Sequence, residues 1–199
     1  MFFDQAVSYA LERLERELSP DLSYHGVFHT RDDVVPAATR LAEMEGLHGE
    51  QLHLLLTAAW FHDLGYVERP RHHELIGVRI VEEVLPGFKY NKKQVEVVKW
   101  AVLATALPQA PQNRLEEILT DADLDVLGRT DFLKRNRDLR LELSHLGRVH
   151  TDDEWYTGQL RFIQDHHYFT ASAHSLRDEQ KQENIKALRS EWELLSLSA

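Results

Sequence analysis

Hydrophobic residues along the chain recur at helical spacing in almost every segment. The first segment has apolar side chains three or four residues apart, at positions 3, 7, 10, 11, 14 and 18. The same spacing predicts further helices over about 29–44, 50–65, 74–85, 92–106, 114–127, 131–146, 152–169 and 175–195. No stretch keeps the alternation of apolar and polar residues that is typical of a strand. The pattern therefore predicts an all-α fold of eight or nine helices.

Glycine and proline mark the ends of these helices. Pro20 stops the first helix and Gly46 follows the second, as expected of residues that interrupt helical hydrogen bonding. Pro36 lies inside the second helix and predicts either a kink or a late start. The helix over 50–65 is apolar on nearly every side, which is typical of a central buried helix.

Length and composition are those of an ordinary soluble protein. The chain has 199 residues, of which 43% are hydrophobic and 28% charged, enough for one domain or for one domain with a helical appendage. It contains no cysteine, which excludes disulfides, thiolate metal sites and cysteine nucleophiles and fits a cytoplasmic location. We see no signal peptide, and the longest apolar run, Leu54 to Phe61, is too short to span a bilayer.

The charge balance narrows the class of ligand. A formal net charge of −10 argues against stable binding to nucleic acid or to anionic membranes. It leaves room for a small phosphate ester, because a bound metal ion can reverse the local field. The expected partner is therefore a small phosphorylated substrate. The oligomeric state stays open, a homodimer included.

Histidines and aspartates at the ends of predicted helices are the candidates for chemistry. His62 and Asp63 end the most apolar segment of the chain, where an uncompensated charge is costly. His25 and His29 stand four residues apart at the start of the second helix, and a later helix ends in the acidic run 121–125. Imidazole and carboxylate are the expected ligands of a divalent metal in a chain without thiolates. Each part alone is common in a chain with 12 histidines, but their positions together predict a metal site.

These residues also match a family pattern in order and context. The strings Tyr-His-x-x-x-His, Phe-His-Asp-Leu-Gly and Asp-Ala-Asp-Leu-Asp-x-Leu-Gly resemble the HD superfamily of metal-dependent phosphohydrolases. Four residues further along resemble one bacterial branch of predicted HD phosphohydrolases: Arg148, Trp155, Tyr156 and Gln159. The resemblance implies a compact multi-helix HD bundle with additional C-terminal helices. It predicts a single domain over 1–199, with a metal-site core at about 22–130 and a helical extension at about 131–199.

Carried over position by position, the resemblance implies a set of four metal ligands: His29, His62, Asp63 and Asp123. Asp121 is the rival for the last position, because the Asp-x-Asp string permits either alignment. The implied cofactor is one divalent ion, and manganese, iron, nickel, cobalt, zinc and magnesium all stay open. Thr105 stands where several branches carry a further histidine, which favours a single tightly held ion and leaves a second open.

The resemblance also implies catalytic roles. Asp63 would orient the attacking water or take its proton. His25 stands where related phosphodiesterases place the histidine that protonates the leaving group, with a structural role as the alternative. His73, with His72 as its rival, resembles the extra histidine that many HD hydrolases carry for a second metal or the substrate phosphate.

Other candidates rest on the residues alone. Arg137 and Arg140 share a helix face and are candidate phosphate-binding residues, although a solvated face is the simpler interpretation. His166 and His167 are adjacent on one predicted helix and therefore point apart, which favours packing or capping over metal binding.

The function implied is metal-dependent hydrolysis of a small phosphate ester by a metal-activated water. The expected substrate is a nucleotide or a related phosphomonoester or diester. Two alternatives stay open: an iron-dependent oxygenase on the same fold, and a helical module that binds a metal or a ligand without catalysis.

Overall fold

The computed structural model describes residues 1–197, and over this part of the chain it contains helices and no strands. The predicted all-α fold is confirmed. The α-helices are α1 (Phe3–Glu17), α2 (Val35–Met44), α3 (Gly49–Phe61), α4 (His73–Val84), α5 (Lys92–Ala104), α6 (Arg114–Asp123), α7 (Phe132–His145), α8 (Asp152–Asp165) and α9 (Ala171–Ser196). A π-helix spans His29–Val34, and short 3-10 helices span Leu64–Val67, Leu85–Phe88 and Asp125–Gly128. Within residues 1–197, no helix has both the length and the apolar character that crossing a membrane requires.

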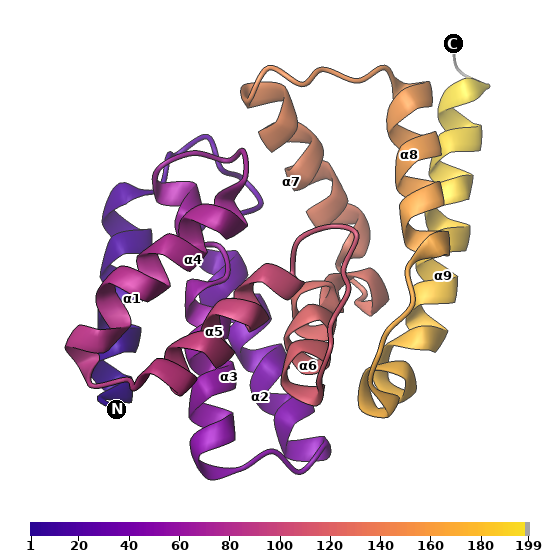
Figure 1. Cartoon of the computed structure of the whole chain (residues 1–199). Helices are drawn as coiled ribbons and strands as arrows, with labels where there is room; N and C mark the ends of the chain where they lie inside the picture. Colours follow the sequence, from indigo (N-terminus) through magenta and orange to yellow (C-terminus); the bar gives the residue numbers. More distant parts are fainter. Residues whose placement is uncertain (198–199) are drawn as a thin grey trace.

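Helices α1 to α6 form one body, and α8 and α9 lie side by side at its edge (Figure 1). Helix α7 runs between these two parts, and a loop joins it to α8 at the end of the molecule away from α2 and α3 (Figure 1). The chain therefore brings its C-terminal helices back alongside the segments that carry the predicted metal ligands.

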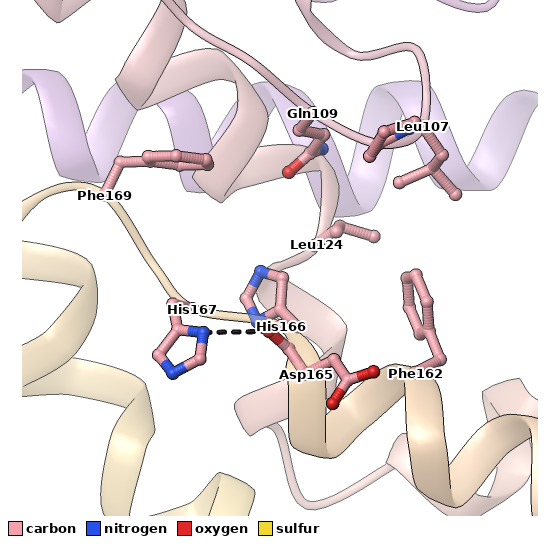
Figure 2. A pocket seen from close by; sticks show the side chains of 9 residues that line it. Leu107, Gln109, Leu124, Phe162, Asp165, His166, His167 and Phe169 are labelled. Atoms are coloured by element: carbon pink, nitrogen blue, oxygen red, sulfur yellow. Dashed lines mark hydrogen bonds between the residues drawn. The ribbon is translucent and has the colours of Figure 1, made fainter.

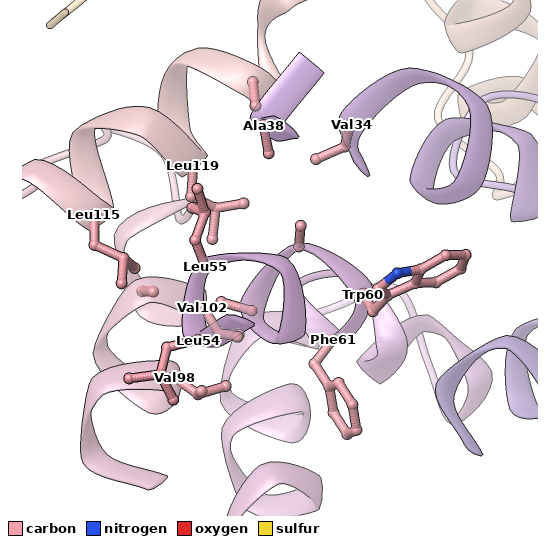
Figure 3. Packing of buried hydrophobic residues seen from close by; sticks show 14 of the residues in the cluster. Val34, Ala38, Leu54, Leu55, Trp60, Phe61, Val98, Val102, Leu115 and Leu119 are labelled. Atoms are coloured by element: carbon pink, nitrogen blue, oxygen red, sulfur yellow. The ribbon is translucent and has the colours of Figure 1, made fainter. Parts of the chain in front are cut away.

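The larger hydrophobic core surrounds α3. Leu55, Ala58 and Phe61 on this helix have no solvent-exposed surface. They pack among apolar side chains of the neighbouring helices, including Val98 of α5 and Leu119 of α6 (Figure 3). Complete burial of a side chain the size of Leu or Phe contributes roughly 1.5–3 kcal/mol. The nearly all-apolar sequence of this helix is explained by its central position.

A smaller hydrophobic cluster joins the C-terminal helices to one another. Trp155 and Ile163 of α8 pack there with Leu188 of α9 and with Val126 and Phe132 from the preceding segment. Trp155 and Tyr156 are buried in this cluster, as expected for core aromatics. The single domain with a metal-site core and a C-terminal extension stays a prediction.

Helix ends differ from the expected ones at the segments that carry the candidate ligands. Helix α3 ends at Phe61 rather than near Gly65, so that His62 and Asp63 form the turn after it. The second helix starts as a π-helix in which the Val35 amide donates to the Thr30 carbonyl. Pro36 follows as one of the first residues of α2, where its missing amide costs nothing, so the late start is confirmed. Wide π turns of this kind are frequent at functional sites.

The turn after α8 also starts earlier than expected. The helix ends at Asp165 instead of continuing to Phe169. The side chain of Lys181 on α9 donates to the carbonyl of His166, and the carboxylate of Asp121 accepts the amides of Phe169 and Thr170 at 2.8 Å each. These tertiary hydrogen bonds replace the last helical turn that the apolar spacing predicts.

Candidate functional site

Three residues from separate elements bring their side chains together at the heart of the molecule. His29 from the π-helix, His62 from the end of α3 and Asp123 from the end of α6 have ligand atoms that all lie within 4.8 Å of one another. The Asp123 Oδ1 lies 3.2 Å from His29 Nε2 and 3.4 Å from His62 Nε2. Two ligands of one ion, each about 2.0–2.2 Å from it, stand roughly 3–3.5 Å apart. The spacing therefore fits a shared divalent ion.

Asp63 lies beside this cluster. Its Oδ2 is 3.3 Å from His62 Nε2 and 3.6 Å from His29 Nε2. His62 Nε2 and Asp63 Oδ2 are buried atoms without a hydrogen-bond partner among the described residues. Unpaired buried polar atoms are costly, and a metal ion is the partner that this donor set fits.

The other ring nitrogen of His62 is already held. Its Nδ1 lies 2.8 Å from the carbonyl of Ala59, one of the carbonyls that the end of α3 leaves unpaired. Because a carbonyl only accepts, the ring carries its hydrogen on Nδ1 and leaves the Nε2 lone pair free. This arrangement is typical of metal-binding histidines.

Charges in the cluster favour the ionised forms of the acids. Burial alone raises the pKa of Asp123, but His29 and His62 lower it more, so the net direction is down. Burial lowers the pKa of His62, and the adjacent Asp63 and Asp123 raise it more, so the net direction is up. The two carboxylates therefore favour a second proton on His62, at Nε2, and a divalent ion would occupy this position in place of that proton.

The three aspartates in the acidic run at the end of α6 make different contacts. Asp123 faces the cluster, whereas Asp121 is turned towards the start of α9 and accepts the amides of Phe169 and Thr170. Asp125 accepts two hydrogen bonds from Arg177 of α9, at 2.7 and 2.9 Å. The geometry favours Asp123 over Asp121 as a ligand, and the other two aspartates attach α9 to the core.

His25 lies at the edge of the cluster in a fixed orientation. Its Nδ1 is 2.5 Å from Oε1 of Glu142, whose other oxygen accepts the backbone amides of Tyr24 and His25 at 2.8 Å each. Its ring stacks on Tyr66 with centroids 4.6 Å apart. Glu142 is 1% exposed, so this carboxylate from α7 is committed to holding His25.

His73 opens α4 directly above Asp63. Its Nε2 is 3.3 Å from Asp63 Oδ1, and its Nδ1 is 3.2 Å from the carbonyl of Pro70. Gly65 permits this approach, because a Cβ at residue 65 would lie 1.9 Å from the carbonyl oxygen of His73. The glycine that follows the His-Asp pair thus positions the extra histidine.

A cavity of about 270 Å³ opens beside the cluster. Asp63, Asp123, His25 and His73 lie along it, together with side chains of α7 and α8. Thr105 also lines it, but its hydroxyl donates to the carbonyl of Val102. The cavity therefore places the clustered acids and histidines next to a space that accepts a small ligand.

Arg137 and Arg140 are not among the residues that line this cavity. Arg137 pairs with Glu191 at 3.3 Å and Arg140 with Asp152 at 2.6 Å. Their role in substrate binding stays a prediction without support from their positions. Arg135 and Arg148 do line the cavity.

A second hollow, of about 350 Å³, lies on the other side of Leu107, Leu124 and Phe162. Figure 2 shows His166 and His167 at this hollow, with His167 bonded to the Asp165 carbonyl. None of the clustered ligands reaches it. Both ring nitrogens of His166 are buried and lack a hydrogen-bond partner among the described residues. The hollow therefore contains none of the clustered ligands, although polar side chains such as Asp165 and His167 line it.

Burial of His166 predicts a measurable pH dependence of stability. Burial first, and the nearby cations second, lower its pKa from 6.5 to about 3; Lys181, His167 and His174 act in this direction and Asp178 opposes them. The unfolded chain takes up a proton below pH 6.5 that the folded chain refuses. Stability is therefore complete above that pH and falls on acidification towards pH 3.

Replacing His166 by Phe keeps the packing and removes the titration. From neutral pH to pH 5, we expect the wild type to lose on the order of 1 kcal/mol more than this variant, or about 2–4 °C in Tm. Thermal denaturation at both pH values measures the difference, with the exposed His48→Phe as the control. Equal losses in all three proteins would contradict the assignment.

Two buried polar residues near the site are not predicted by the sequence pattern. Glu142 and Asn136 lie in the highly charged segment 131–146, which has the character of a solvated helix. Both are buried, at 1% and 6% exposure. Arg135, Leu139 and Glu142 stand four and three residues apart, and this spacing is the one indication in the sequence that a polar face turns inwards.

Comparisons with known proteins agree with this geometry. Residues 33–125 match the family model of the HD domain, which covers His62, Asp63 and Asp123 and begins after His29. No curated protein matches the chain. The crystal structure of Bacillus subtilis YpgQ in complex with ADP is similar, with 21% identity, a TM-score of 0.64 and 94% of each chain covered.

A structural genomics structure from Lactobacillus plantarum is also similar, with 19% identity and a TM-score of 0.67. The match covers 96% of this chain and 97% of that one. At these identities the two structures establish a shared fold over nearly the whole length. The family model therefore places the HD-domain pattern in residues 33–125, and the two structures share the overall fold of this chain.

Proposed function

We propose that this protein is a divalent-metal-dependent phosphohydrolase of a small phosphate ester, with a nucleotide as the expected substrate. The observation that carries the proposal is the set of His29, His62, Asp63 and Asp123 beside a cavity, with His62 Nε2 and Asp63 Oδ2 buried and unpaired. The HD-domain match supports the reaction class. The ADP in the similar YpgQ structure supports a nucleotide as the ligand.

The proposed mechanism gives each residue at the cavity a separate task. When bound, a divalent ion supplies Lewis acidity, which activates water for attack on phosphorus and neutralises charge on the phosphoryl group. His29, His62, Asp63 and Asp123 would hold the ion, and Asp63 would also orient the attacking water. His25 donates a proton to the leaving oxygen, and Glu142 keeps that ring in place. Arg135 and Arg148 add positive charge at the cavity wall.

Metal reconstitution tests the proposal directly. We expect the purified protein to hold about one divalent ion per chain and to hydrolyse nucleotides after reconstitution with manganese, cobalt, nickel or magnesium. His62→Ala should lower both metal content and kcat/KM more than 100-fold. Mutation of the outer partners of metal ligands already lowers metal affinity or activity about 10–100-fold, and His62 is proposed as a direct ligand. The exposed His174→Ala serves as the control. Intact turnover in His62→Ala, or oxygen consumption in place of phosphate release, would refute the proposal.

A further inference from the structure

The polar side chains that line the cavity include two chemically different groups. One is Asp63 and Asp123 of the candidate metal cluster, and the other is the amide pair of Asn136 from α7 and Gln159 from α8. Apolar side chains line the space as well: Val126, Leu127, Phe132, Leu139, Leu143 and Phe162. Both amide residues lie outside the segment that matches the HD domain. A ligand in this cavity therefore meets apolar side chains and amide groups as well as the clustered acids.

The indole of Trp155, which can only donate a hydrogen bond, fixes the orientation of these two amides. Trp155 is 4% exposed, and its indole Nε1, which only donates, lies 3.0 Å from Oδ1 of Asn136. The other amide atom of Asn136 is therefore its NH₂ group. That group lies 2.5 Å from Gln159, so the Gln159 atom facing it is the carbonyl oxygen.

The consequence concerns the polarity of the cavity wall. The oxygen of Gln159 is occupied by Asn136, and none of residues 1–197 is seen to accept from its NH₂ group, so that group is available to a ligand. Gln159 thus offers hydrogen-bond donors to the cavity.

We propose that Gln159 is a specificity-determining residue that donates to an acceptor at position 1 or 6 of a purine base of the substrate, either a ring nitrogen or a carbonyl oxygen. Trp155 and Asn136 act as positioning residues, because they hold the Gln159 amide in its orientation. The inference rests on the proposed function for the binding of the substrate phosphate. The substrate class is then a nucleoside phosphate whose base lies between apolar walls.

Two substitutions reverse the polarity of this wall in different ways. In Gln159→Glu, one carboxylate oxygen still accepts from Asn136 and the other faces the ligand as an acceptor. In Asn136→Asp, the indole keeps its acceptor, but the second oxygen now requires a donor, which turns the Gln159 NH₂ group away from the ligand. Both variants present an acceptor where the wild type presents a donor.

The experiment compares nucleotides that differ on one edge of the base. We measure kcat/KM for the adenine and hypoxanthine deoxynucleoside triphosphates, and for base-free tripolyphosphate, in the wild type and in both variants. The adenine-to-hypoxanthine ratio should change about tenfold, in the same direction in both variants, with the tripolyphosphate rate within about threefold. Gln159→Met should weaken nucleotide turnover, and Gln164→Glu on the same helix is the control. Equal losses on all substrates, or an unchanged ratio, would overturn the proposal.

Binding of nucleosides to the metal-free protein separates this inference from the proposed function. Adenosine and inosine lack phosphate, so calorimetry measures the affinity of the cavity for the nucleoside without a contribution from phosphate. The same change of preference should appear in Gln159→Glu and Asn136→Asp. If the wild type hydrolyses no phosphate ester, the proposed function fails while this comparison still decides the role of Gln159. Nucleoside affinities that are unchanged in both variants would refute that role.

Discussion

Replacing Asp123 by Asn is expected to remove the bound metal and to lower kcat/KM more than 100-fold, whereas Asp121→Asn keeps both. The two residues are neighbours in one acidic run, but only Asp123 has an oxygen within 3.2–3.4 Å of both imidazoles. An amide oxygen carries no charge, and loss of a direct ligand costs more than the 10–100-fold found for outer partners. Metal analysis after dialysis, followed by kinetics on the reconstituted proteins, measures the difference.

Asp121→Asn has a different expected defect. Its carboxylate accepts the amides of Phe169 and Thr170 at the start of α9, and Asp121 is 1% exposed. The side-chain oxygen of Asn replaces only one of the two carboxylate oxygens, so one of these backbone amides loses its acceptor. An unsatisfied buried donor costs about 1–3 kcal/mol. Urea denaturation should therefore show a loss of stability with the metal still bound. The opposite pattern, with metal lost in Asp121→Asn and kept in Asp123→Asn, would reassign the ligand.

The sequence contains enough to predict the helices and the metal end of the site. Apolar spacing predicts α3 as the central helix, and the uncompensated charge at its end makes His62 and Asp63 candidates. The family resemblance adds His29 and Asp123. The resemblance does not decide between Asp121 and Asp123 as the ligand, because two carboxylates separated by one residue differ only in the segments that pack against them. In the folded protein, the turn at Phe169 and Thr170 packs against Asp121.

The ligand end of the site depends on contacts between distant segments. Glu142 reaches the backbone of Tyr24 and His25 across more than a hundred residues of chain, and no local pattern encodes that pairing. The donor polarity of Gln159 follows only once Trp155 and Asn136 are in contact. Sequence periodicity predicts which face of a helix turns inwards, but it does not predict what that face meets.

Replacing His25 by Ala is expected to lower the rate in a manner that depends on the leaving group. Proton donation contributes about 10²–10⁴-fold when the leaving oxygen needs a proton. It contributes little when the leaving group departs as a stable anion. We therefore expect a loss of at least about 100-fold on phenyl phosphate and less than tenfold on p-nitrophenyl phosphate. Steady-state kinetics on both esters, with the exposed His145→Ala of α7 as the control, gives the comparison.

Glu142→Gln extends this test to the residue that holds the ring. Burial raises the pKa of Glu142, but the bonds from His25 and from the backbone amides lower it more, so the side chain is a carboxylate. The carboxylate holds the Nδ1–H of the His25 ring in a fixed orientation, and the neutral amide of Gln weakens that hold while preserving the shape of the side chain. Glu142→Gln should therefore show the same dependence on the leaving group as His25→Ala. Its loss of rate on phenyl phosphate should be smaller than that of His25→Ala, in which the ring itself is removed. Equal losses on both esters in either variant would show that His25 and Glu142 shape the cavity without moving a proton.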